Sequence, residues 1–189
     1  MRAKREIGDL MNHDYLLEQG TRFLENNEYV KALNCYDIVT NSDPYNTEAF
    51  YLRGLLNFKL GRYKGALHDL NKAIETGMSL ANIFFFRAMA YRRLNMPEIS
   101  IRDFNKAISL SENHADAFCN RGLAYYSILN DDRAIDDFTK ALSLRKDPKV
   151  FFYRGLAYAR KGLPDKAVAD FSDEYLANLE HNTQRPEEE

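Results

Sequence analysis

The sequence predicts an all-α solenoid, a stack of helix-turn-helix repeats, and three observations support this fold class. The stretch 115–144 recurs four more times along the 189-residue chain, and a fixed period of about 20 to 50 residues is typical of solenoids. Large and very small residues alternate at helical spacing within the stretch, which lets two helices approach closely. The turn-forming run Asn130-Asp131-Asp132 divides the stretch into two helices. The residues that mark the period are Gly20, Gly54, Ala88, Gly122 and Gly155, at steps of 34, 34, 34 and 33 residues.

Residues 1–12 precede the first repeat and carry apolar residues on one helical face. Ile7, Leu10 and Met11 follow the spacing i, i+3, i+4, so a short amphipathic helix could form here and cap the stack. The segment could equally fray, or fill a groove on a neighbouring copy of the chain. The sequence leaves these alternatives open.

Five repeats follow and predict one elongated domain. The first repeat diverges most, as terminal repeats do. Leu60-Gly61-Arg62 predicts the turn inside the second repeat, and Pro97 opens the second helix of the third. Asp147-Pro148 predicts the N-cap and first residue of the helix that begins the fifth repeat. The predicted limits of the repeats are 13–46, 47–80, 81–114, 115–147 and 148–181.

The end of the stack is predicted from the last helix. Glu174 stands where repeats two to four have an Ala that would press on a following repeat. A carboxylate at this position indicates that no repeat follows. Leu176 and Leu179 continue an apolar stripe, and residues 182–189 are expected to form a flexible acidic tail.

The alternation of large and small residues resembles the tetratricopeptide repeat (TPR) family, whose helix-turn-helix unit of about 34 residues carries Gly, Tyr, Ala and aromatic positions. The resemblance extends over residues 13–181 in five copies. It implies a right-handed superhelical solenoid that acts as a protein–protein interaction module, an adaptor or scaffold without catalytic activity. In the fourth repeat the residues that carry the resemblance are Phe118, Gly122, Tyr125, Ala134, Phe138 and Ala141.

Composition excludes several classes of partner. The net charge of −2 provides no cationic field that would attract nucleic acid or an anionic membrane surface. No stretch approaches about 18 uninterrupted apolar residues, so we expect no membrane span and a cytoplasmic protein.

Reactive side chains are scattered. Cys35 and Cys119 occupy different positions in different repeats, which predicts free thiols rather than a disulfide or a metal site. The histidines lack partners at the spacing of a metal site or a catalytic triad, and no phosphate-binding glycine loop is present. We therefore expect no catalytic residue, no metal and no cofactor. The four histidines are His13, His68, His114 and His181.

A charge pair recurs in repeats two to five, each of which has an Arg before the small residue and an Asp 16 residues later. One interpretation is a ladder of guanidinium groups for an acidic ligand. We favour a spine of structural ion pairs, because an Asp accompanies every Arg and paired, partly buried charges usually serve each other. The pairs are Arg53 with Asp69, Arg87 with Asp103, Arg121 with Asp137 and Arg154 with Asp170.

The TPR resemblance also implies a concave groove, because fixed positions of each repeat's first helix face it in that family. These positions are apolar and aromatic in the middle, with cations along one edge, and they include Lys59. We expect the groove to bind an amphipathic helix or an extended peptide of another protein, with Arg92, Arg93 and Arg160 pairing with acidic groups of the ligand. The predicted groove residues are Tyr51, Leu52, Leu55, Phe58, Phe85, Phe86, Met89, Arg92, Arg93, Asn120, Leu123, Tyr126, Lys149, Phe152, Tyr153, Leu156 and Arg160.

Other functions fit the same pattern less well. The alternative is a homo-oligomeric scaffold in which a neighbouring subunit fills the groove. A helical repeat that reads RNA bases is disfavoured because the groove is apolar. Part of the family clamps the carboxylates of chaperone C-termini, but only Asn120 and Lys149 match that pattern, so this clamp is not expected.

Overall fold

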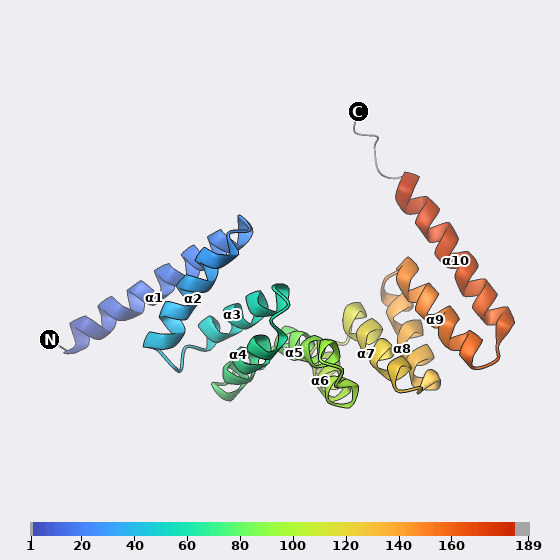
Figure 1. Cartoon of the computed structure of the whole chain (residues 1–189), viewed down its shortest axis with the longest axis horizontal. Coiled ribbons are helices and arrows are strands. Elements are labelled where there is room, and N and C mark those ends of the chain that lie inside the picture. The colour runs from blue at the N-terminus through green and yellow to red at the C-terminus, as the bar shows by residue number, and fades with distance from the viewer. Residues whose placement is uncertain (1, 184–189) are drawn as a thin grey trace. The chain divides into compact units, whose positions relative to one another are not determined.

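The computed structural model describes the backbone of residues 2–183 and the side chains of residues 13–173. Ten α-helices follow one another in residues 2–183 with no strand between them, which confirms the all-α prediction (Figure 1). The helices are α1 (Arg2–Glu25), α2 (Tyr29–Ser42), α3 (Thr47–Lys59), α4 (Tyr63–Glu75), α5 (Ala81–Arg93), α6 (Pro97–Leu110), α7 (Ala115–Ser127), α8 (Asp131–Leu144), α9 (Pro148–Arg160) and α10 (Pro164–Thr183).

The helices form two compact units, and the boundary falls within α5, after Ala90. In the first unit, α1 packs on α2, α2 on α3, and α3 on α4. In the second unit each helix from α6 to α10 packs on the next, and α7 also contacts α9. Packing of each helix mainly on its neighbours in sequence is the arrangement of a helical solenoid, as predicted.

Side-chain caps set the starts of several helices. Asn46 accepts a hydrogen bond from the backbone N–H of Ala49 at 2.9 Å and so begins α3. Asn130 caps α8 in the same way, which confirms the break predicted at this position. Asp147 caps α9, with Pro148 as its first residue. Each cap satisfies an N–H group that has no partner within its helix.

The turns between paired helices share a left-handed residue. Leu129 has φ of 62°, and Gly61 and Gly162 have φ of 73° and 72°. Asn27 and Asn95 adopt the same conformation at 59° and 58°. These residues are 34, 34, 34 and 33 positions apart, so the period of the sequence is also the period of the backbone.

The small residues lie where two helices of a hairpin come closest. A Cβ atom added to Gly122 would lie 2.7 Å from Cε1 of Phe138, which is fully buried. The same close approach joins Gly20 to the ring of Tyr36. These contacts confirm that the large and small residues interlock between the helices of one repeat.

The first and last helices are longer than those between them. α1 runs from Arg2 through residue 13 without a break, and α10 continues to Thr183. Whether Ile7, Leu10 and Met11 cap the stack depends on side chains outside the described residues, and so does the predicted role of Glu174, Leu176 and Leu179. Residues 184–189 of the predicted tail also lie outside them, and the repeat limits stay a prediction. In the described part of the chain, no helix is both long and apolar enough to cross a membrane.

Candidate functional site

An apolar pocket of about 320 Å³ opens in the first unit, between side chains of α1, α3 and α5. Four of the residues at predicted groove positions, Leu55, Phe58, Lys59 and Phe86, line it. Five of its six lining side chains are apolar, so water inside it gains little from the walls. The lining residues are Leu24, Leu55, Leu56, Phe58, Lys59 and Phe86.

Aromatic contacts hold the wall of this pocket in place. The ring of Phe86 meets Phe58 edge-on at 5.5 Å between centroids, and meets Phe85 in the same way at 5.3 Å. Phe58 also packs against Tyr63 at 5.6 Å. Edge-to-face pairs of this kind stabilise defined ring orientations, so the pocket is largely formed before any ligand arrives.

The remaining predicted groove residues of the first unit are partly buried. Tyr51, Leu52 and Met89 are all in this class. Burial raises the pKa of Tyr51 by more than its hydrogen bond with Asn82 lowers it, so its hydroxyl is neutral at physiological pH.

Lys59 is the charged residue of the pocket lining. Its side chain is exposed, and its Nζ lies 4.9 Å from the centroid of the Tyr29 ring. Within the described side chains, no carboxylate oxygen lies within 4.0 Å of this ammonium group. A positive charge therefore borders an apolar cavity.

In the second unit, the structure brings Arg92 and Asn120 together. Arg92 Nη2 donates to Asn120 Oδ1 at 3.1 Å, and the amide nitrogen of Asn120 donates to the carbonyl of Asp116 at 2.8 Å. Burial, and secondarily the charge of Arg93, lower the pKa of Arg92. Arg93 itself is exposed.

The other predicted residues of the second unit lie on α7 and α9. Phe152 is 39% exposed, and its ring packs 5.6 Å from that of Tyr153. Leu123 and Tyr153 pack on the buried core of this unit. Leu156 is half-buried and Lys149 is exposed. Among these residues, Phe152 and Lys149 present the most accessible surface.

Arg160 is engaged within the chain. Its Nε donates to the two carboxylate oxygens of Asp131 at 2.9 and 2.7 Å, and its guanidinium stacks 3.7 Å from the centroid of the Tyr126 ring. The hydrogen bond with Asp131 raises the pKa of Arg160. The expected pairing of Arg160 with an acidic ligand therefore competes with a carboxylate that the chain already supplies.

Three of the four predicted Arg–Asp pairs are structural ion pairs in the fold. Arg121 donates to the Asp137 carboxylate through Nε at 2.8 Å and Nη2 at 2.7 Å. Its Nη1 donates to Asn105 of the preceding repeat at 2.6 Å, so one guanidinium joins three helices. Burial raises the pKa of Asp137 by more than the guanidinium lowers it. The same bidentate geometry joins Arg53 with Asp69 and Arg154 with Asp170.

Arg87 and Asp103 belong to different units. Within the first unit, Arg87 Nη1 donates to Asn71 Oδ1 at 2.8 Å, which parallels the bond from Arg121 to Asn105.

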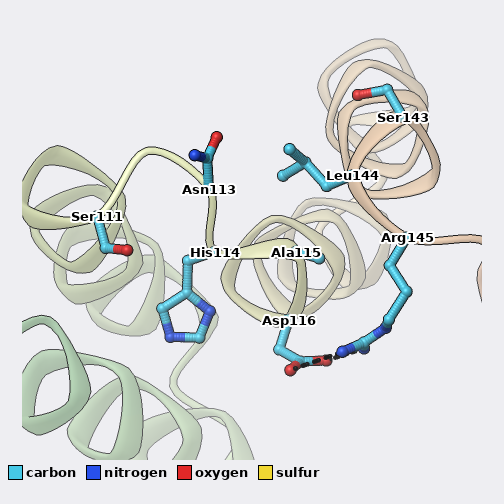
Figure 2. A pocket seen from close by; sticks show the side chains of 8 residues that line it. All are labelled: Ser111, Asn113, His114, Ala115, Asp116, Ser143, Leu144 and Arg145. Atoms are coloured by element: carbon cyan, nitrogen blue, oxygen red, sulfur yellow. Dashed lines mark hydrogen bonds and ion pairs between the residues drawn. The ribbon is translucent and has the colours of Figure 1, made fainter.

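A second, polar pocket of about 580 Å³ lies in the second unit, beside the start of α7 and the end of α8. Figure 2 shows Asp116 pointing toward Arg145, with which it forms an ion pair. His114 caps α7 by accepting a hydrogen bond from Ala117 N–H, and burial lowers the pKa of its imidazole. The carboxylate is thus neutralised and the imidazole is used as a cap. The lining residues are Ser111, Asn113, His114, Ala115, Asp116, Ser143, Leu144 and Arg145.

The histidines whose side chains the structure describes lie on different elements, with His13 on α1, His68 on α4 and His114 before α7. In the described residues, no group of three or more His, Cys, Asp or Glu side chains is arranged to hold a metal ion. Cys35 and Cys119 are both free, as predicted.

Two residues of the apolar pocket were absent from the predicted set. Leu24 precedes Phe58 by 34 residues, so the period alone could have identified it as a groove position of the first repeat. Leu56 is almost fully buried, and its sequence position predicts a core residue. Only the packing shows that such a residue also forms part of a pocket wall.

Comparisons with known proteins agree with this architecture. Three sequence profiles described as tetratricopeptide repeat match residues 17–80 with 132–183, residues 81–114, and residues 115–148. No curated protein sequence matches the chain.

Solved structures share the fold. A crystal structure of MamA protein is 24% identical and superposes with a TM-score of 0.84, over 93% of this chain and 96% of that one. A second crystal structure of MamA is 26% identical, with a TM-score of 0.81 over 88% and 97%. YrrB, described as "a TPR protein with an unusual peptide-binding site", is 22% identical, with a TM-score of 0.77 over 84% and 82%.

Proposed function

The chain belongs to the tetratricopeptide repeat family, and on this premise we propose that it is a non-catalytic interaction module that binds a segment of another protein. The segment is an amphipathic helix or an extended peptide, and one of its large apolar side chains enters the pocket between α1, α3 and α5. The cytoplasmic location expected from the composition belongs to the same proposal.

The apolar pocket is the observation that carries this proposal. Its volume of about 320 Å³ lies at the lower end of the range for ligand pockets and accommodates part of a peptide. Binding energy at protein interfaces concentrates where an aromatic or aliphatic anchor fills a well-packed pocket. The edge-to-face rings of Phe58 and Phe86 provide such packing.

The likeness to YrrB supports the class of function. That protein is described as having a peptide-binding site, and the two chains share a fold. At 22% identity the likeness does not locate a site in this chain, so the location rests on the pocket alone.

A selection of displayed random 12-residue peptides on the wild-type protein tests the proposal. Phe86→Ala removes one wall of the pocket, and we expect it to weaken the selected peptides about 5- to 150-fold, the range for loss of an interface hot spot. Tyr45→Ala is the matched control, because it removes an aromatic ring of the same unit that is 81% exposed and does not line the pocket.

Fluorescence polarisation measures the affinities, and circular dichroism verifies that each variant is folded. Equal affinities of wild type and Phe86→Ala would reject the pocket as the binding site. Concentration-dependent dimers in light scattering that Phe86→Ala abolishes would instead show that a second copy of the chain fills the pocket, which is the homo-oligomeric alternative.

A further inference from the structure

We propose that the pocket selects a partner segment whose apolar anchor is flanked by an acidic residue, and that Lys59 determines this selectivity. The inference rests on the proposed function and specifies the chemistry of the ligand. It is based on a comparison of two residues that occupy equivalent positions in different repeats, Lys59 and Arg160.

Lys59 and Arg160 occupy the same position in their repeats. Lys59 follows Gly54 by five residues, and Arg160 follows Gly155 by five. Each is the last residue of its helix, α3 or α9, where a cation interacts favourably with the helix dipole. Each side chain reaches back to the preceding repeat.

In the second unit the preceding repeat neutralises the cation. Asp131 follows Gly122 by nine residues, begins α8 and binds the guanidinium of Arg160 through both carboxylate oxygens. Tyr126 follows Gly122 by four residues and stacks under the same group at 3.7 Å. The positive charge of Arg160 is therefore compensated by a carboxylate within the chain.

In the first unit the equivalent residues supply no carboxylate to the cation. Tyr29 follows Gly20 by nine residues and begins α2, so it takes the place of Asp131 and offers Lys59 a ring face at 4.9 Å instead of a carboxylate. Leu24 takes the place of Tyr126 and lines the apolar pocket rather than stacking on the cation.

These substitutions give the pocket a charged rim. The Tyr29 ring holds the ammonium of Lys59 near the cavity through a cation–π contact. A carboxylate beside a bound anchor would then form a charge-assisted hydrogen bond next to an apolar surface that excludes water. A neutral or basic residue at that place would gain nothing or be repelled, which is how a rim charge produces specificity.

The test uses the peptides selected from the 12-residue library, each also synthesised with Gln in place of the Glu or Asp next to the anchor. We expect wild type to bind the acidic form about 3- to 10-fold more tightly at low salt, and less so at high salt. Lys59→Met should abolish the difference. Tyr29→Asp should reduce it as well, because it supplies the carboxylate that Asp131 supplies to Arg160. Lys64→Met is the control of equal charge change, since Lys64 is exposed and does not line the pocket.

The two proposals fail differently. This inference is overturned if the selected peptides carry no acidic residue beside the anchor, or if the preference for the acidic form persists in Lys59→Met. In either case, binding that still depends on Phe86 leaves the proposed function standing. Binding that does not depend on Phe86, or no binding at all, overturns both. Circular dichroism confirms that the variants are folded. Lys59→Met removes the charge of Lys59, whereas Tyr29→Asp neutralises it with a neighbouring carboxylate.

Discussion

Adding one methyl group to Gly122 should destabilise the protein, although alanine is the better helix former. The added Cβ would lie 2.7 Å from Cε1 and 2.9 Å from Cδ1 of Phe138, whereas carbon atoms in contact are about 3.5 to 4.0 Å apart. The ring is fully buried and would have to move by about 1 Å into packed surroundings. Overpacking of this kind costs about 3 kcal/mol at its upper end, and the helix propensity of alanine offsets about 1 kcal/mol.

We therefore expect Gly122→Ala to lower the free energy of unfolding by about 2 kcal/mol, which corresponds to a Tm lower by about 4 to 8 °C in a chain of this size. Thermal and urea unfolding followed by circular dichroism measure both quantities. Gly65→Ala is the control, because its added Cβ would lie 3.4 Å from Nδ2 of Asn57, which is an ordinary contact. It should stabilise by about 0.5 to 1 kcal/mol through helix propensity alone.

A second variant tests the cause of the destabilisation. Gly54 faces Leu70 rather than an aromatic ring, so the fold already tolerates a smaller partner at this position. Gly122→Ala combined with Phe138→Leu should cost at least about 1 kcal/mol less than the sum of the two single variants. The reasoning is refuted if Gly122→Ala is as stable as wild type, or if the two effects simply add.

Two further predictions concern buried polar groups. Arg121→Ala should lower the free energy of unfolding in urea by about 1 to 4 kcal/mol, because it leaves a buried carboxylate without its guanidinium. The Arg121→Ala/Asp137→Ala variant should lose less stability than the sum of the two single variants. Strict additivity would contradict a structural pair. Burial raises the pKa of Cys119 from 9.0 to about 11, which favours the unreactive thiol. In a Cys35→Ala background, iodoacetamide at pH 8 should label Cys119 about 100-fold more slowly in the folded than in the urea-unfolded chain, with the rate rising toward pH 11, since the thiolate fraction falls from about one tenth to about one thousandth. Similar rates in the two states would contradict this.

Residues that repeat at a fixed spacing explain why so much of the fold was predictable. The Arg before each small residue and the Asp that follows belong to one helical hairpin, so their pairing needs no information from distant parts of the chain. The N-caps Asn130 and Asp147 act on N–H groups two or three residues away. The left-handed conformation of Leu129 was not predictable from its residue type, because leucine avoids it and only the hairpin geometry imposes it.

The sequence by itself determined the helices, their pairing into hairpins and the contacts inside each hairpin, because these depend on side chains that recur with the period of the chain. Only the tertiary structure shows which of the predicted groove residues already have a partner within the chain. Lys59 and Arg160 are equivalent in sequence, yet one borders an apolar pocket and the other is paired with Asp131 and stacked on Tyr126. The difference arises because each cation takes its environment from the preceding repeat, and the electrostatic energy of a charge depends on the groups that surround it in space.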